Sequence, residues 1–142
     1  MEMRNTSNEL LRKEISSRVE VSILVRTFYS KVRAHDTLGP IFNGIISDWE
    51  GHLERLTDFW EMVLLNSGPG AGKFSPVPVH KAVDRTVNQA LEQRHFGNWL
   101  ELWFGTLDEL FEGANAAYAK EHARNMAHIL FFRIMEGRSK AT

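Results

Sequence analysis

Cysteine is absent from the 142-residue sequence, and this absence removes several classes of protein at once. Without thiols the chain can form no disulfide, no thiolate zinc site, no iron–sulfur cluster and no cysteine nucleophile. A surplus of positive charge is also missing, because 17 Lys and Arg face 18 Asp and Glu, for a formal net charge of −1. Proteins that bind nucleic acid or an anionic membrane surface usually carry a basic surplus, so we expect neither partner.

Long hydrophobic runs are lacking as well. The longest uncharged segments, 37–47 and 62–72, fall short of the roughly 20 residues that a membrane-spanning helix needs. The first 14 residues contain no apolar core of the kind found in secretory signal peptides. On these absences we expect a soluble, cytoplasmic protein with no membrane partner.

Aromatic side chains are the most informative feature that is present. Nine Phe, four Trp and two Tyr accompany six His, in a chain that is 43% hydrophobic and 25% charged. The composition and length are typical of one globular domain. So many flat side chains indicate either a dense core or a pocket for a flat ligand, and the composition does not decide between them.

Apolar residues recur with the 3.6-residue period of amphipathic helices along most of the chain. These stripes run from Val21 to Val32, Trp49 to Leu64, Val79 to Leu91, Phe96 to Phe111 and Ala119 to Ile134. No sustained alternation of polar and apolar residues signals a strand. The expected fold class is therefore all-α.

Several residues mark the expected ends of these helices. The segment 38–44 contains a Gly-Pro pair and is expected to form a turn. Ser47 and Glu50 have the spacing of a capping box at a helix start, whereas Gly113 and Gly137 are expected to end two helices.

One long loop is expected at residues 66–78, which hold three Gly and three Pro. Loops of this length inside a compact domain are often functional. The loop contains the sequence GAGKF, but a phosphate-binding loop would have Ser or Thr after the lysine and would follow a strand. We therefore expect no phosphate site there.

Other common catalytic and metal-binding patterns are not found. The sequence has no HExxH zinc motif and no GxSxG nucleophile elbow. His122 and His128 are six residues apart on one predicted helix, so they point to different faces and are expected to be solvated or partly packed. His35 and His95 lie beside predicted helix ends, where we expect polar surface roles.

The remaining candidate site combines two histidines with aromatic residues. His52 and His80 lie on different predicted helices, and Phe59 and Trp60 lie between them in the sequence. Each residue alone is readily explained as a satisfied core histidine or as ordinary aromatic core. Together they also suit haem, because an imidazole at the start of a short helix can bind the iron axially and aromatic side chains can form the pocket walls.

Four segments, taken in order, resemble the truncated globins, and most of all the third group of that bacterial family. They are FYSKVRAHDTLGPIFN (28–43), WEGHLERLTDFWEMVLL (49–65), PVPVH (76–80) and HFGNWLELWFGTLDELFEG (95–113). The resemblance spans roughly residues 21–135. It implies a 2-on-2 sandwich of helices around haem b in a domain over residues 21–137. An N-terminal extension over 1–20, partly helical or disordered, and a tail over 138–142 complete the expected organisation.

The resemblance also implies roles for individual residues. His80 matches the proximal iron ligand, and Tyr29, Trp99 and His52 match the residues that stabilise a ligand on the distal side. The implied lining of the haem pocket is Phe28, Phe42, Leu56, Phe59, Trp60, Phe96 and Trp103. Candidates for the salt bridge to a haem propionate are Lys73, Arg85 and Arg94.

Three functional hypotheses stay open at this point. The first is a haem protein that reversibly binds O₂, NO and CO at a five-coordinate iron and releases O₂ slowly, because two hydrogen-bond donors would hold it. The second is a haem enzyme that oxidises NO as a dioxygenase or consumes peroxide, with electrons from a separate reductase. The third is a haem-free helical interaction module.

Overall fold

The computed structural model describes residues 12–68 and 93–141, and within α7 it describes side chains up to residue 133. These residues form the helices α2 (Arg18–Ala34), α3 (Leu38–Ile45), α4 (Trp49–Leu65), α6 (Gln93–Leu110) and α7 (Ala114–Ala141). In these ranges the β-structure is limited to an isolated bridge between Lys13 and Phe111. The expectation of an all-α fold is confirmed.

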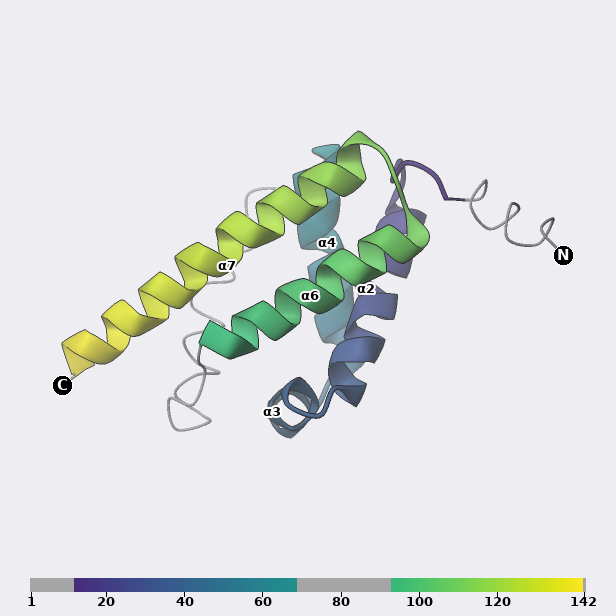
Figure 1. Ribbon diagram of the computed structural model, residues 1–142. Coiled ribbons are helices and arrows are strands. Elements are labelled where there is room, and N and C mark those ends of the chain that lie inside the picture. The colour runs from purple at the N-terminus through teal and green to yellow at the C-terminus, as the bar shows by residue number, and fades with distance from the viewer. Residues whose placement is uncertain (1–11, 69–92, 142) are drawn as a thin grey trace, which may run out of the picture.

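The helices form two crossed layers. In Figure 1, α6 and α7 run antiparallel beside each other in one layer, and α2 and α4 form the layer behind them. Helix α2 packs against α3, α4 and α6, and α4 also reaches α7. The arrangement is therefore a sandwich of two helix pairs, with the hydrophobic core between the layers.

Helix α2 supplies the central face of this core. Its buried stripe is Val21, Leu24, Val25, Phe28, Tyr29 and Val32. The helix begins after Ser17, and the Glu20 carboxylate reaches back to accept the backbone N–H of Ser16 at 2.7 Å and that of Ser17 at 2.9 Å. Lys13 pairs with the same carboxylate at 2.7 Å. These hydrogen bonds, led by the one from Lys13, lower the pKa of Glu20 to about 2.

Ion pairs hold α2 on α4 along the outer edge of their contact. The Arg18 guanidinium lies 2.7 Å from Asp58, 2.7 Å from Glu61 and 3.0 Å from Glu54. The hydrogen bond to Glu61 and then that to Asp58 raise the pKa of Arg18 further above its ordinary value. Because the guanidinium is partly exposed, this network fixes the pairing of the helices more than it adds to stability.

The prediction of a turn at residues 38–44 is wrong, because this segment belongs to helix α3. Pro40 is tolerated because it lies in the first turn, where its missing N–H has no partner in the helix. Gly39 lets α3 approach the end of α2 closely: a Cβ atom at this position would lie 2.5 Å from the carbonyl oxygen of Arg33. The glycine that was expected to break the helix therefore serves packing instead.

Two other expected helix boundaries also need correction. Helix α4 is capped by Asp48 rather than by Ser47, because the Asp48 carboxylate accepts the Gly51 N–H at 3.0 Å. Helix α7 continues through Gly137 to Ala141, since glycine weakens a helix without having to end it. Gly113 lies in the connection from α6 to α7 with a φ of 107°, as a residue that follows a helix end often does.

The segment before α2 takes part in the fold. Ile15 is fully buried in the core. The Glu14 carboxylate accepts the backbone N–H groups of Ala114 at 2.9 Å and Asn115 at 2.8 Å, and so caps the start of α7. Part of the predicted extension over 1–20 therefore stabilises the helical sandwich, while the boundaries at residues 20 and 137 stay predictions.

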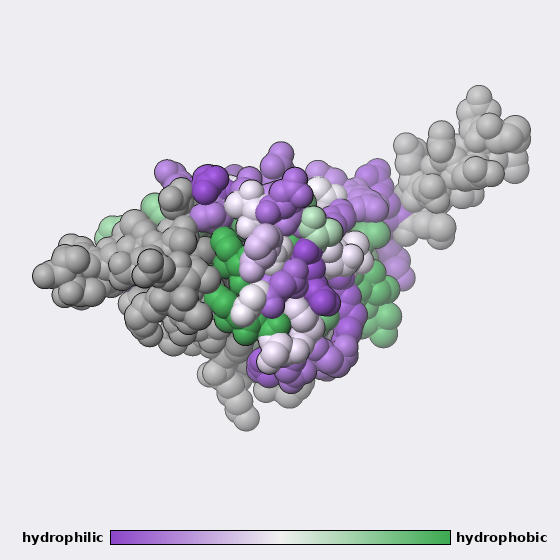
Figure 2. Space-filling view, turned by 90° about the horizontal axis from the view of Figure 1, so that it is seen from below, coloured by the Kyte–Doolittle hydropathy of each residue, from purple (hydrophilic) through white to green (hydrophobic). Residues whose placement is uncertain are grey.

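On the face shown in Figure 2, the described surface is mostly hydrophilic, with hydrophobic groups between the polar ones. In the part of the chain that the structure describes, no helix combines the length and apolar character needed to cross a membrane.

Candidate functional site

The aromatic side chains gather around Tyr29, where α2, α3 and α4 meet. The centroid of the Tyr29 ring lies 4.7 Å from that of Phe28, 6.4 Å from Phe42, 6.0 Å from Trp49 and 5.8 Å from His52. We call these five residues the Tyr29 cluster. Only 6% of Tyr29 is exposed, so its hydroxyl lies in a largely apolar environment.

Helix α6 adds two tryptophans to the same region. Trp99 and Trp103 are one helical turn apart and stack with an interplanar angle of 7° at 5.9 Å. The Phe28 ring stands edge-on to both, at 5.2 Å from Trp99 and 4.9 Å from Trp103. The structure thus brings the predicted residues Tyr29, His52, Phe28, Phe42, Trp99 and Trp103 into one aromatic assembly.

The two tryptophans differ in the partners of their indole N–H groups. The Trp103 N–H donates to the carbonyl oxygen of Ala119 at 3.1 Å. The Trp99 N–H is buried and has no hydrogen-bond partner among the described atoms. A buried donor without a partner costs about 1–3 kcal/mol, so this group calls for an acceptor beyond those that residues 12–68 and 93–133 provide.

Burial controls the protonation of Tyr29. Removal of the phenol from water raises the pKa of Tyr29 to about 12. The nearby Trp99 N–H acts in the opposite direction on this pKa. The two groups do not reach hydrogen-bond geometry, and the indole nitrogen therefore stays unpaired. At neutral pH the Tyr29 hydroxyl keeps its proton and can donate it to a ligand.

His52 lies at the half-buried edge of the Tyr29 cluster, in the first turn of α4. Its ring is nearly perpendicular to Tyr29, and it also contacts Trp49 at 5.7 Å. The Arg33 guanidinium covers Trp49 at 4.6 Å from the ring centroid. Sequence reasoning did not assign Trp49 to the site, although its position three residues before His52 places both on one helix face.

The residues of this region fit a flat, apolar cofactor such as haem. An unpaired indole N–H and a protonated phenol provide donors, and the apolar rings of Phe28, Phe42 and Trp49 lie beside the phenol. Apolar walls with a few placed donors are the usual composition of a cofactor site.

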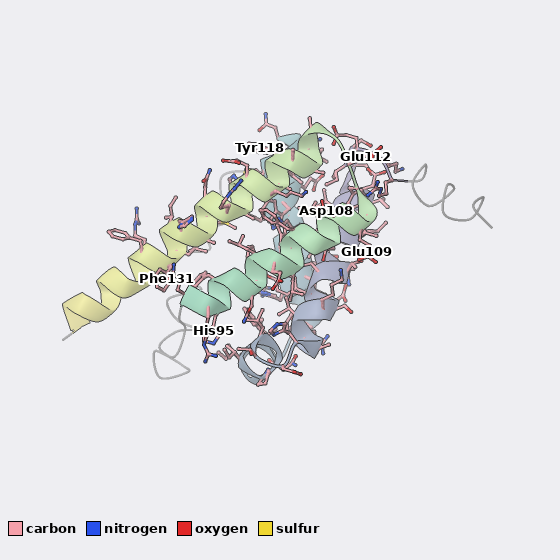
Figure 3. The ribbon with its side chains drawn as sticks, viewed as in Figure 1. His95, Asp108, Glu109, Glu112, Tyr118 and Phe131 are labelled. Carbon is pink, nitrogen blue, oxygen red and sulfur yellow. The ribbon has the colours of Figure 1, made fainter. Side chains whose placement is uncertain are left out.

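The other predicted lining residues lie on α4 and α6. Leu56, Phe59 and Trp60 are buried on α4, and Trp60 stacks on Trp103 at 4.6 Å. Phe96 lies on α6 against Phe131 of α7 at 5.5 Å, and Figure 3 labels Phe131 on that helix. All four residues belong to the same sandwich, with Phe96 on the side where α6 meets α7.

The histidines outside this assembly behave in three ways. The expected surface role of His95 is wrong, because this residue, near the start of α6 (Figure 3), is only 5% exposed. It lies one turn before Trp99 and therefore shares its face. His35 has the expected polar role, since its Nδ1 atom accepts two backbone N–H groups just before α3. His122 is partly packed and His128 exposed, as expected.

Four predicted residues concern the proximal side and the propionates. His80, Lys73 and Arg85 lie outside the described residues, as do the helix expected from Val79 to Leu91 and most of the loop over 66–78. Arg94 lies in the first turn of α6. Within the described ranges, no three His, Asp or Glu side chains converge as a metal site.

The comparisons with known proteins agree with this geometry. No family model matches the chain. The group 3 truncated hemoglobin ctb of Campylobacter jejuni is 30% identical over 105 residues, which is 71% of this chain and 77% of that protein. The crystal structure of group III truncated hemoglobin from Campylobacter jejuni has a TM-score of 0.74 and 27% identity to this chain, and the match covers 87% of this chain and 94% of that one. The relative and the solved structure confirm the resemblance first found in the four sequence segments. The chain belongs to the group 3 truncated hemoglobins.

Proposed function

We propose that this protein reversibly binds O₂, and also NO and CO, at a haem b whose iron is held axially by His80. Family membership supports a globin-type haem protein. The observation that carries the proposal further is the unpaired N–H of Trp99 beside the protonated hydroxyl of Tyr29. Two buried donors at one place suit a small ligand with an acceptor atom.

Haem held by one neutral imidazole supplies an open coordination position for a diatomic ligand. Tyr29 and Trp99 would donate hydrogen bonds to the outer atom of O₂, which carries partial negative charge in such a site. Hydrogen bonds to charged groups contribute about 1.5–3 kcal/mol, which corresponds to roughly 10- to 100-fold in a dissociation rate. CO is less polar and gains less from the same donors. This favours tight binding and slow release of O₂.

His52 is proposed as a gate rather than a third donor. The ring is half-buried at the edge of the Tyr29 cluster and rests against Tyr29 and Trp49. An imidazole at this edge can move outward into solvent and open a path for a ligand. The apolar side chains of Phe28, Phe42 and Leu56 would keep water from the same space.

Haem enzyme chemistry is the second candidate. Two donors aimed at one ligand can also polarise the O–O bond of a peroxide, or support oxidation of NO to nitrate. Either reaction would need electrons from a separate reductase over repeated turnovers. Autoxidation and NO-reaction rates, measured with and without a reductase, would separate this candidate from reversible binding.

The first test is the absorption spectrum of the purified protein with and without CO. We expect a haem spectrum that responds to CO in the wild type. His80→Ala should lose most of the haem, because it removes the axial ligand, and added imidazole should restore binding in His80→Gly. The exposed His128 provides a matched control, and His128→Ala should retain the wild-type spectrum. If His80→Ala keeps an unchanged haem spectrum, His80 is not the axial ligand.

A further inference from the structure

A row of aromatic rings leads from the Tyr29 cluster to the protein surface. Trp99 stacks on Trp103 at 5.9 Å, and Trp103 stacks on Trp60 at 4.6 Å. Trp60 contacts His122 at 5.6 Å, and His122 contacts Tyr118 at 5.8 Å. We call these five residues the aromatic row. It crosses the sandwich from α6 through α4 to α7, where Figure 3 labels Tyr118.

The members of the row are suited to electron transfer. Indole and phenol are the side chains that most readily lose a single electron in a protein that has no cysteine. Trp103 and Trp60 are only 0% and 2% exposed, so water has little access to either ring while it is oxidised. Burial also lowers the pKa of His122, which favours a neutral imidazole between Trp60 and Tyr118. A neutral ring adds no positive charge to oppose an oxidised neighbour.

The outer end of the row is chemically distinct. The sequence contains only two tyrosines, Tyr29 and Tyr118. Tyr29 is 6% exposed, whereas Tyr118 is 50% exposed. An exposed phenol can release its proton to water when it loses an electron, so an oxidised Tyr118 would become a neutral radical that other molecules can reach.

We propose that the aromatic row conducts electrons from Tyr118 to the haem site when hydrogen peroxide oxidises that site, and that Tyr118 is a surface site of one-electron oxidation. This inference rests on the proposed haem binding. It adds an activity beyond ligand binding, because oxidising equivalents leave the buried site at a defined surface residue.

The reaction balances over two protein chains. One hydrogen peroxide molecule accepts two electrons and two protons, its O–O bond breaks, and two water molecules form. Tyr118 in each of two chains gives up one electron and its phenolic proton. The two phenoxyl radicals then couple by a new carbon–carbon bond. Two tyrosines and one peroxide therefore yield one dityrosine and two waters.

The test treats the haem-loaded protein with hydrogen peroxide and measures dityrosine fluorescence, covalent dimer on a denaturing gel, and the tyrosyl radical by rapid-freeze electron paramagnetic resonance. The wild type should give all three signals. Tyr118→Phe should abolish the covalent dimer. Trp60→Phe should lose most of it, because phenylalanine is hard to oxidise, and Trp60→Tyr should restore it with a ring that can be oxidised. Haem absorption and CO binding establish that each variant still holds its cofactor.

Each result has a definite meaning. Equal dimer yields in Trp60→Phe and the wild type would overturn the row as the route, and dimer in Tyr118→Phe would overturn the exit site. A wild type that binds CO but forms no dityrosine would overturn this inference and leave the proposed function intact. A protein that retains no haem would fail already at the absorption spectrum, and both proposals would fall.

Discussion

Trp99 and Trp103 are the same residue type on the same helix, stacked one turn apart, yet they are built into the protein differently. Trp103 is fully buried and its N–H is satisfied by Ala119 of α7. Trp99 is half-buried and its N–H has no partner in the described part of the chain. We infer that Trp103 holds α6 to α7, whereas Trp99 reserves its donor for a ligand.

The same division extends to the surrounding polar groups. Away from the Tyr29 cluster, several buried polar side chains are satisfied by the chain itself, whereas the Arg12 Nε atom is a second buried donor without a partner among the described atoms. Thr57 and Thr106 each donate to a carbonyl oxygen of their own helix at 2.7 Å, and Glu20 accepts several hydrogen bonds at the start of α2. Complete pairing favours stability, and among the unpaired donors the one on Trp99 lies beside the buried Tyr29 hydroxyl, where a ligand can accept from both.

The largest expected effect comes from removing the donors that face the proposed ligand. Tyr29→Phe should raise the O₂ dissociation rate by roughly 10-fold or more, since about 1.4 kcal/mol corresponds to a factor of ten. Trp99→Phe should act in the same direction, because it removes the unpaired N–H. Stopped-flow measurement of O₂ release would show both effects, and CO release should change less.

The double variant sharpens this prediction. Tyr29→Phe and Trp99→Phe should be non-additive when combined, because both donors serve one acceptor. Trp103→Phe removes an N–H that is already bonded within the protein, so it should change the O₂ dissociation rate less than Trp99→Phe does. If neither single change at Tyr29 or Trp99 moves the O₂ dissociation rate, ligand stabilisation does not depend on these residues.

The second prediction concerns stability, where Trp103 should matter more than Trp99. Trp103→Phe should lower the free energy of unfolding by about 1–3 kcal/mol, because a buried hydrogen bond is lost and a small cavity forms. Trp99→Phe should cost less than Trp103→Phe, because it breaks no hydrogen bond within the described chain and removes a buried donor that is itself unfavourable to the fold. Urea unfolding of the two variants side by side checks this. Equal losses would contradict the division of roles between the two tryptophans.

Much of the fold could be predicted from the sequence because helical periodicity is a local signal. The stripes of α2, α4, α6 and α7 give the helices and the faces that form the core. Helix α3 was missed because Gly39 and Pro40 disfavour a helix interior, whereas their actual positions are in the first turn and against α2. Only the three-dimensional packing shows that both residues are tolerated there.

The site was predictable in part, because local motifs identify candidate residues but do not give the contacts between helices. Motif order indicated Tyr29, His52 and Trp99, and the structure brings them together in space. The burial of His95 and the place of Trp49 beside His52 depend on how α4 and α6 are rotated, which periodicity gives only approximately. The difference between the N–H groups of Trp99 and Trp103 depends on a carbonyl 16 residues away from Trp103, which no local pattern reveals.

The third prediction concerns Glu20, a polar residue whose hydrogen bonds at the start of α2 stabilise the fold. The pKa of Glu20 is lowered to about 2 in the folded protein, from an ordinary value of 4.5. A lowered pKa means that the ionised carboxylate stabilises the fold above about pH 4.5, and that this contribution is lost as the pH falls towards about 2. Glu20→Gln should therefore reduce the free energy of unfolding by about 1 kcal/mol at pH 7, as loss of a capping interaction does.

The difference between wild type and Glu20→Gln should shrink as the pH is lowered from about 4.5 to 2. Urea unfolding of both proteins at several pH values gives this difference directly, and acid effects common to both proteins cancel. Glu54, an exposed partner of Arg18 and Arg26, offers a control, and Glu54→Gln should change stability less. A difference that grows in acid would contradict the sign of the Glu20 effect.

The smallest effect is expected at His52, which is neither a stabilising core residue like Trp103 nor a proposed ligand donor like Trp99. His52 touches Tyr29 and Trp49 but is half-buried at the edge of the cluster, so we expect it to limit entry rather than to hold a ligand. His52→Ala should speed ligand association a few-fold, which corresponds to less than about 1 kcal/mol in the barrier, and should change dissociation less. Flash photolysis with CO measures association, and stopped-flow mixing measures O₂ release from the same protein. His128→Ala, at an exposed position on α7, controls for the loss of an imidazole elsewhere. If His52→Ala raises O₂ release as strongly as Tyr29→Phe does, then His52 is a donor like Trp99, and the gate role is wrong.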